Sequence, residues 1–370
     1  MVDLTAEDSE EGKDVNTIKL TLHRGRVFME LIDYFLNDEN IDYKKITVQM
    51  INNKGEKEKG VDDGGVFRDA ISEFYNYFIN RFTFGSTSEV VPVLKDEFGT
   101  LKWTAIARII RKGYEQADYF PVFITKPFMI ACIMKEENFD ADYLLECLYN
   151  IIGPSSSETL KEAISNWEKF NTKPDQTEVQ LSEEELLKRQ EKEDDLMEIL
   201  CDLNSDRKPK SGTHLREMLK EIAHLTIIQS PKFVIDTWQT TFVNLMPPEK
   251  ITELYETRTC TVENVLRIIP SALNLSKEED NIVGFLRRFI RLCSPDMRKK
   301  FLLFATGAMA VAVKQLGLVF TTYKHNLEVR FIAHTCGPVL EMPTNYSKFG
   351  DFRSDLEDQL AANYLVMDIA

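Results

Sequence analysis

The residues best suited to covalent chemistry lie near the end of the chain, in the string Ala333-His334-Thr335-Cys336. A cysteine acts as a nucleophile when its thiol is accessible, partly ionised near neutral pH and close to a dipole or hydrogen-bond donor. The ring of His334 and the hydroxyl of Thr335 are the neighbouring groups suited to this task. Gly337 and Pro338 follow directly and predict a turn, which places the thiol at a strand end or loop. So short a string arises often by chance, and on these residues alone a structural cysteine stays an open alternative.

The other five cysteines lie in contexts that indicate no chemistry. Cys132, Cys147, Cys201 and Cys293 stand beside apolar helical positions, where we expect buried cysteines that act as small hydrophobic side chains. Cys260 lies between two threonines and has no base near it in the sequence. The cysteines form no CxxC pair, and the chain has no phosphate-loop or dinucleotide-binding motif. We therefore predict no metal site and no cofactor.

Length and charge restrict the class of partner. A chain of 370 residues predicts two or three domains, and its 45 basic against 60 acidic residues give a formal charge of −15. So acidic a protein is repelled by phosphate backbones, which argues against a nucleic-acid partner. Residues 1–15 are acidic, where a secretory signal is basic and then apolar. The longest apolar stretch, 302–313, is shorter than the roughly 20 residues that span a bilayer. We expect a soluble protein of the cytoplasm, the nucleus or both, without a membrane partner.

The elements that must position Cys336 fall into two parts. Residues 1–15 are expected to form an acidic, disordered tail, and the polar interruption around 270–280 is the best candidate for a domain boundary. Before it the patterns are mainly helical, including a highly charged, solvated helix within 171–207, and after it they indicate a small α/β domain. Helices are expected over 22–36, from Phe67 onward, over 214–269, over 282–290 and over 352–364. Further helices are expected in pieces over 103–167, broken at Pro121, Pro127 and Gly153. Short strands are expected over 46–51, 301–304, 317–320, 327–332 and 339–342.

Three motifs together resemble one enzyme family. Around the cysteine the chain reads Arg330-Phe331-Ile332-Ala333-His334-Thr335-Cys336 and then Leu340-Glu341-Met342-Pro343-Thr344-Asn345-Tyr346. Upstream are Phe301-Leu302-Leu303-Phe304-Ala305-Thr306-Gly307 and Gly60-Val61-Asp62-Asp63-Gly64-Gly65-Val66-Phe67-Arg68-Asp69. In order and separation these segments resemble HECT-type ubiquitin ligases, with the patterns Leu-Pro-x-Ala-His-Thr-Cys, a strand and turn Phe-Leu-x-Phe-Val-Thr-Gly, and Gly-Val-Asp-x-Gly-Gly-x-x-Arg-Glu. The resemblance covers the chain from about residue 16, and the middle segment, 214–238, is also similar to a G2/M phase-specific member of the family.

The resemblance implies a bilobal α+β fold. A mainly helical N-lobe with a small sheet, residues 16–272, would be hinged through 273–280 to a smaller α/β C-lobe, residues 281–370, that carries the catalytic cysteine. The implied partners are ubiquitin, an E2 conjugating enzyme that binds near 170–230, and a protein substrate.

The resemblance also implies an E3 ubiquitin transferase mechanism. Cys336 would accept ubiquitin from the E2 thioester and pass it to a substrate lysine, with Thr335 and backbone N–H groups stabilising the oxyanion and His334 orienting the active-site loop. Asp351 and Asp368 are the nearest candidates to take the proton of the lysine amine.

Departures from the family pattern support an alternative. Arg330-Phe331 stand where the family has Leu-Pro, Gly337-Pro338 replace Phe-Asn, and Met367 stands where the family often has a Phe four residues from the C-terminus. The alternative is a degenerate HECT fold that binds ubiquitin or a conjugating enzyme as a scaffold without transferring ubiquitin. A cysteine hydrolase that uses Cys336 with a distant histidine is a third, weakly supported reading.

Overall fold

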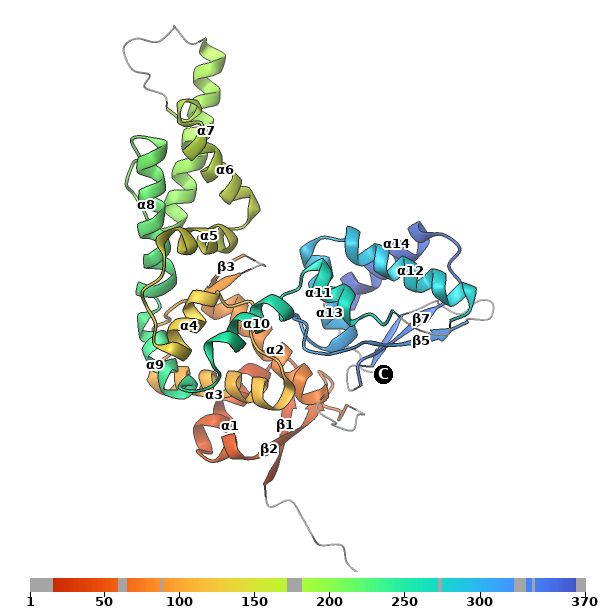
Figure 1. Cartoon of the computed structure of the whole chain (residues 1–370). Coiled ribbons are helices and arrows are strands. Elements are labelled where there is room, and N and C mark those ends of the chain that lie inside the picture. Colours follow the sequence, from red (N-terminus) through yellow and green to blue (C-terminus); the bar gives the residue numbers. More distant parts are fainter. Residues whose placement is uncertain are drawn as a thin grey trace, which may run out of the picture.

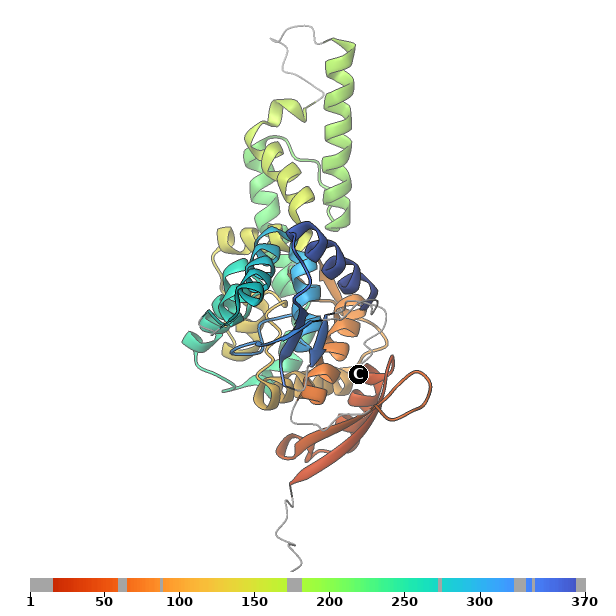
Figure 2. The ribbon, with the colours of Figure 1, turned by 90° about the vertical axis from the view of Figure 1, so that its right-hand side faces the viewer.

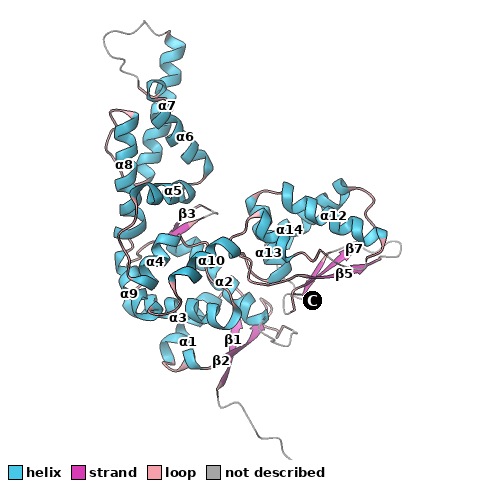
Figure 3. Ribbon diagram, viewed as in Figure 1, coloured by secondary structure: helices cyan, strands magenta, loops and turns pink. Residues whose placement is uncertain are grey.

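The fold combines many helices with three small sheets. The computed structural model describes residues 16–58, 65–86, 89–171, 182–271, 275–322, 331–334 and 337–363. Within these ranges the sheets have two, two and three strands. Figure 3 shows that helices make up most of the described ribbon. The predicted α+β class is therefore confirmed. Among the described residues, every helix is too short or too polar to cross a lipid bilayer.

The buried side chains form two hydrophobic clusters. The first core draws on residues 20–254 together with Ala308, Ala310 and Ala312, and the second core draws on residues 265–360. The division along the chain thus falls between Leu254 and Val265, ahead of the expected hinge at 273–280. The lobe boundaries 16–272 and 281–370 stay predictions, as does the tail at 1–15, which lies outside the described residues.

The first described elements form a parallel strand pair, of which the sequence predicted the strand over 46–51 but not its partner. Strand β1 (Thr17–His23) pairs in parallel with β2 (Lys45–Ile51), and α1 (Val27–Asn37) and the short 3-10 helix η1 (Ile41–Tyr43) connect them. The helix expected from residue 22 was wrong in its first residues. Leu20 and Leu22 are buried while their neighbours are more exposed, the period of two that belongs to a strand. Gly25, with φ of 79°, turns the chain between strand and helix.

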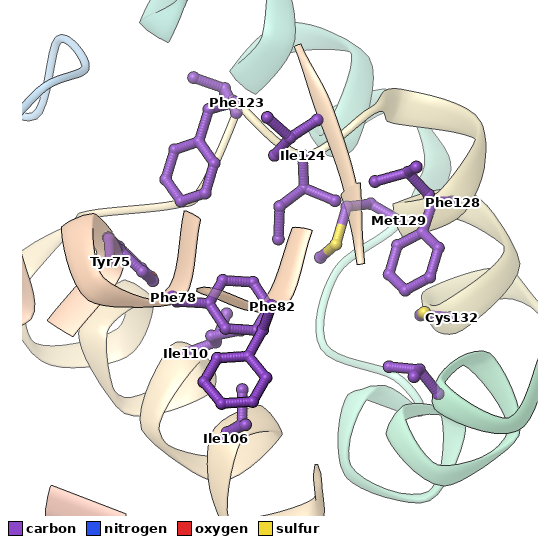
Figure 4. Close-up of a cluster of buried hydrophobic side chains, with 14 of the residues drawn as sticks. Tyr75, Phe78, Phe82, Ile106, Ile110, Phe123, Ile124, Phe128, Met129 and Cys132 are labelled. Carbon is purple, nitrogen blue, oxygen red and sulfur yellow. The ribbon is translucent and has the colours of Figure 1, made fainter. Parts of the chain in front are cut away.

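Aromatic side chains fill the centre of the first core (Figure 4). Its elements are α2 (Gly65–Phe82), β3 (Thr83–Gly85), β4 (Val90–Pro92), α3 (Thr100–Ala117), α4 (Lys126–Met134), α9 (Lys232–Phe242) and α10 (Pro248–Arg258). Tyr75, Phe78 and Phe82 project from one face of α2, and Trp103 and Trp238 lie with ring centroids 6.3 Å apart. The aromatic stripe from Phe67 is thus core, as predicted.

A bundle of helices, here called the arm, projects from this body (Figures 1 and 2). It consists of α5 (Ala141–Ile152), α6 (Pro154–Ser165), the 3-10 helix η2 (Trp167–Lys169), α7 (Glu183–Asp202) and α8 (Gly212–His224), and the π-helix η3 (Leu225–Gln229) continues α8 toward α9. Helix α7 is the predicted charged, solvated helix. A capping box between Ser182 and Glu185 starts it, and most of its side chains are exposed.

The second core is a small α/β unit. It contains α11 (Val262–Ile268), α12 (Lys277–Leu292), α13 (Pro295–Thr306), β5 (Gly317–Thr321), β6 (Ile332–His334), β7 (Val339–Pro343) and α14 (Phe349–Asn363). The strand order is β5-β7-β6, with β5 parallel and β6 antiparallel to β7. The predicted helices over 282–290 and 352–364 and the strands over 317–320 and 339–342 are present; of the strand over 327–332, only residues 331–332 are described.

The strand expected over 301–304 was wrong, because this segment is the end of helix α13. Ser294 caps the helix by accepting from the N–H of Met297, and Pro295 occupies the first turn. Phe301, Leu302 and Ala305 then lie on one buried face, a helical spacing that a four-residue apolar run hides.

Arg298 stabilises the second core from within. Its side chain is only 8% exposed and donates to the carbonyl oxygens of Ile290 at 3.4 Å, Cys293 at 3.1 Å and Cys260 at 3.3 Å. The first two carbonyls belong to the end of α12, where no helical N–H remains to pair with them.

We expect Arg298→Met to lower the free energy of unfolding by about 2–4 kcal/mol, because the buried carbonyl groups of Ile290 and Cys293 and the partly buried carbonyl group of Cys260 each lose a charged donor. Urea denaturation followed by circular dichroism measures the change. Arg353→Met is the matched control, since Arg353 forms an exposed pair with Glu357 and its loss should change the free energy of unfolding by less than about 0.5 kcal/mol. Equal effects of the two substitutions would contradict this role of Arg298.

Candidate functional site

The strand that leads to the expected nucleophile lies at the edge of the small sheet. Among the described residues, β6 pairs with β7, through Ile332 opposite Glu341 and His334 opposite Val339. Gly337 and Pro338 form the predicted turn before β7. Thr335 and Cys336 lie outside the described residues, so the structure describes the strand before them and the turn after them.

His334 is held by a carboxylate from the neighbouring strand. Its Nε2 lies 2.7 Å from Oε1 of Glu341, and the side chain of His334 is 44% exposed. A carboxylate can only accept, so the shared proton is on Nε2, and in the neutral ring Nδ1 is left as the acceptor. The bond orients the ring of His334 against β7, while the expected roles of His334 in orienting the loop and in catalysis stay predictions.

The residue before β6 is fixed to the last helix. The N–H of Phe331 donates to Oε1 of Gln359 at 2.9 Å, and Nε2 of Gln359 donates to the carbonyl oxygen of Phe331. The ring of Phe331 is 2% exposed and stacks on Tyr346, with centroids 5.9 Å apart. The ring also meets Phe352 of α14 edge-on at 5.2 Å. Phe331, which departs from the family pattern, is therefore a core residue that anchors β6.

Tyr346, another residue of the family motif, closes this aromatic cluster. Its hydroxyl donates to Oδ2 of Asp355 at 2.9 Å, and its ring lies edge-on to Phe352 with centroids 5.4 Å apart. Of the expected proton acceptors, Asp351 lies exposed in the first turn of α14. Asp368, like Met367, lies outside the described residues.

The Gly-rich motif near the N-terminus leads into a buried charge network. Gly65 opens α2, and Gly60 to Gly64 lie outside the described residues. Asp69, the last motif residue, is fully buried and lies 2.5 Å from the guanidinium of Arg24, which also binds Glu58 at 2.9 Å. Burial raises the pKa of Asp69, and the charge of Arg24 opposes this rise. Sequence reasoning missed Arg24, which lies far from the motif in the chain and carries no pattern of its own.

The five described cysteines divide by burial. Cys132, Cys147 and Cys293 are buried, and Cys260 is partly buried, in keeping with structural roles. The expectation that Cys201 is buried was wrong: it follows the fully buried Leu200 on α7, and one helical step of about 100° carries it into solvent. Burial raises the pKa of the Cys147 and Cys260 thiols to about 12. Neither thiol is activated as a nucleophile.

The described residues also line a groove that lies away from β6. Among these residues, no three His, Cys, Asp or Glu side chains come close enough together to hold a metal ion. A groove of about 310 Å³ lies where β3 and β4 meet the end of α7 and η3, away from β6. It is lined by Phe84, Val91, Pro92, Val93, Leu94, Asp202, Leu203, Asn204, Thr226 and Ser230.

Comparison with known proteins adds no assignment to this geometry. No protein-family model matches the chain, and no curated protein matches it.

We expect iodoacetamide at pH 7 to label Cys201 well before the other four described cysteines. With a pKa of about 12, Cys260 is ionised in roughly one molecule in 100,000 at pH 7, and its labelling should rise about tenfold for each pH unit up to that pKa. Peptide mass spectrometry measures both rates, and labelling in urea shows that every thiol is reactive once unfolded. Labelling of Cys260 at pH 7 as fast as that of Cys201 would contradict this prediction.

Proposed function

We propose that this chain is a HECT-type ubiquitin-transferring unit in which Cys336 is the nucleophile. The observation that carries the proposal is the segment Ala333-His334-Thr335-Cys336, with the two further family motifs upstream in family order. The described surroundings support it. β6 ends in a partly exposed His334 and is fixed to α14 through Phe331, so the chain enters the segment from a rigid element.

The proposed reaction has two acyl transfers. The thiolate of Cys336 attacks the thioester carbonyl carbon of the E2-bound ubiquitin, a C–S bond forms, and collapse of the tetrahedral oxyanion expels the thiolate of the E2 cysteine. A substrate lysine amine then attacks the new thioester, the C–N bond forms, the amine loses a proton, and the Cys336 thiolate leaves. The first exchange is nearly balanced in free energy, because one thioester replaces another. Holding the two sulfur atoms together therefore supplies most of the acceleration.

The arm is the proposed docking surface for the conjugating enzyme. Leu186 and Leu187 of α7 are 40% and 62% exposed on a helix that projects from the body (Figure 1). Apolar side chains rimmed by charge on a projecting element are typical of a protein-binding surface.

The unit would act in the cytoplasm, the nucleus or both.

The alternative proposal is a degenerate HECT fold that binds ubiquitin or a conjugating enzyme without transfer. Gly337-Pro338 and Met367 favour it, because they replace family residues next to the proposed nucleophile and near the C-terminus. The two proposals differ in one observable, a covalent thioester between ubiquitin and this chain.

We expect incubation with ubiquitin, activating enzyme, ATP and a panel of conjugating enzymes to give a ubiquitin adduct that reducing agent removes on a gel. Cys336→Ala should abolish the adduct, and Cys336→Ser should abolish it or convert it into an ester that resists reduction. Cys201→Ser is the matched control, since it removes the exposed thiol of α7 and should leave the adduct unchanged.

An adduct that survives Cys336→Ala would refute Cys336 as the acceptor. No adduct with any conjugating enzyme, from protein shown to be folded, would favour the scaffold. A pull-down with ubiquitin and with each conjugating enzyme then tests the binding that the scaffold requires.

A further inference from the structure

The segment Gly307–Val313, here called the strap, lies between the two cores. It follows α13, and its side chains divide between the clusters. Ala308, Ala310 and Ala312 pack into the first core, whereas Val311 and Val313 pack into the second. The strap therefore belongs to both cores at once, although α13 before it and β5 after it belong to the second.

Three groups of the first body bind the backbone of the strap. The hydroxyl of Ser72, on α2, donates to the carbonyl oxygen of Gly307. The hydroxyl of Tyr119, just beyond α3, accepts from the N–H of Met309 at 3.0 Å. Ser72 and Tyr119 are both buried, so neither bond is exchanged for a bond to water while the strap is seated.

Arg258, at the end of α10, provides the third attachment. Its carbonyl oxygen accepts from the N–H of Val311 at 2.9 Å, and its Nη1 donates back to the carbonyl oxygen of Val311 at 2.8 Å. Its Nη2 also forms an ion pair with Asp118 at the end of α3. Arg258 thus ties the strap to two helices of the first body.

The same residues mark the place where the chain passes between the cores. Ile269 and Ile282 flank the expected hinge at 273–280, yet both are buried in the second core. The crossing lies instead between α10 and α11, at Thr259–Thr261, where Thr259 and Thr261 have extended backbones with ψ of 142° and 164°. Movement of one core against the other would therefore turn about Thr259–Thr261. It would break the bonds that Asn264 and Arg267 of α11 donate to the carbonyl oxygens of Glu256 and Thr257 in α10, and it would also unseat the strap.

We propose that the strap is a latch that holds the two cores in one arrangement and whose release permits rotation about Thr259–Thr261. Its backbone bonds and its alanine contacts must open together, because the strap is one short stretch of chain. If Cys336 accepts ubiquitin, an inference that rests on the proposed function, then the latch regulates the movement of Cys336 between conjugating enzyme and substrate.

Amide hydrogen exchange of the free full-length chain tests the latch without ubiquitin. Tyr119→Phe keeps the ring and removes the acceptor of the Met309 N–H, and Ser72→Ala removes the donor to Gly307. In each variant, exchange at Met309 and Val311 should accelerate about fivefold or more, since each change removes one buried hydrogen bond from the closed state only. The N–H of Leu316, which donates to Ile268 at 2.8 Å inside the second core, should keep its rate.

Two controls keep this test decisive. Arg353→Ala removes an exposed arginine of α14 far from the strap in the chain and should change none of these rates. If Tyr119→Phe destabilises the first core as a whole, the exchange rates of Ser72→Ala, the smaller change, are used to test the latch. Exchange at Met309 and Val311 that stays unchanged in both variants, or that accelerates only together with Leu316, overturns the latch.

The regulatory part is tested by the rate at which the ubiquitin adduct forms. Ser72→Ala and Tyr119→Phe should change this rate in the same direction and by at least threefold, while Arg353→Ala should not. If amide exchange accelerates while the rate of ubiquitin-adduct formation is unchanged, the proposed regulation is wrong but the latch itself is supported. If the chain without substitutions forms no adduct at all, the proposed function is wrong. The latch is then tested by the amide exchange rates alone.

Discussion

The structure depends on burying seven residues of irregular backbone between two hydrophobic cores. Peptide groups in such a place cost free energy unless each finds a partner, and the strap forms no helix or strand that would supply one. Side chains of the first body do so instead, through Ser72, Tyr119 and Arg258. The alanines of the strap allow the close approach that these bonds require. The longest apolar stretch of the sequence, 302–313, is thus explained as the end of α13 and a doubly buried strap.

Helices and strands whose apolar residues repeat with one regular period could be predicted from the sequence, whereas the junctions between elements could not. Helix α12 was predicted because Ile282, Leu286, Phe289 and Ile290 mark one apolar face. Residues 22–26 were wrongly assigned to the helix because a seven-residue strand and the helix meet at Gly25. The apolar positions of the strand, with a period of two, therefore run directly into those of the helix. Residues 301–304 were misread because a short apolar run does not distinguish a strand from a helix end. Its N-cap, seven residues upstream at Ser294, does.

The residue types of the candidate site could be listed from the sequence, but its geometry could not be predicted. His334 and the turn at Gly337-Pro338 follow from the sequence alone. The carboxylate that binds His334 does not, because Glu341 becomes its neighbour only through the register of β6 against β7. Likewise Phe331 departs from the motif in the sequence, and only the contacts of its ring with Tyr346 and Phe352 show why an aromatic residue fits there. Pairing across strands and helices is a tertiary property that one sequence does not display.

Motion of the candidate site is coupled to the joint between the cores. β6 is bonded to β7 and, through Phe331, to α14, and both of these elements are built into the second core. β6 and the turn at Gly337-Pro338 are therefore carried by the second core as a whole. Rotation of this core against the first strains the backbone bonds that Arg258 makes with Val311. In the proposed latch, residues outside the candidate site, Ser72 and Tyr119 among them, contribute to the free-energy cost of moving it.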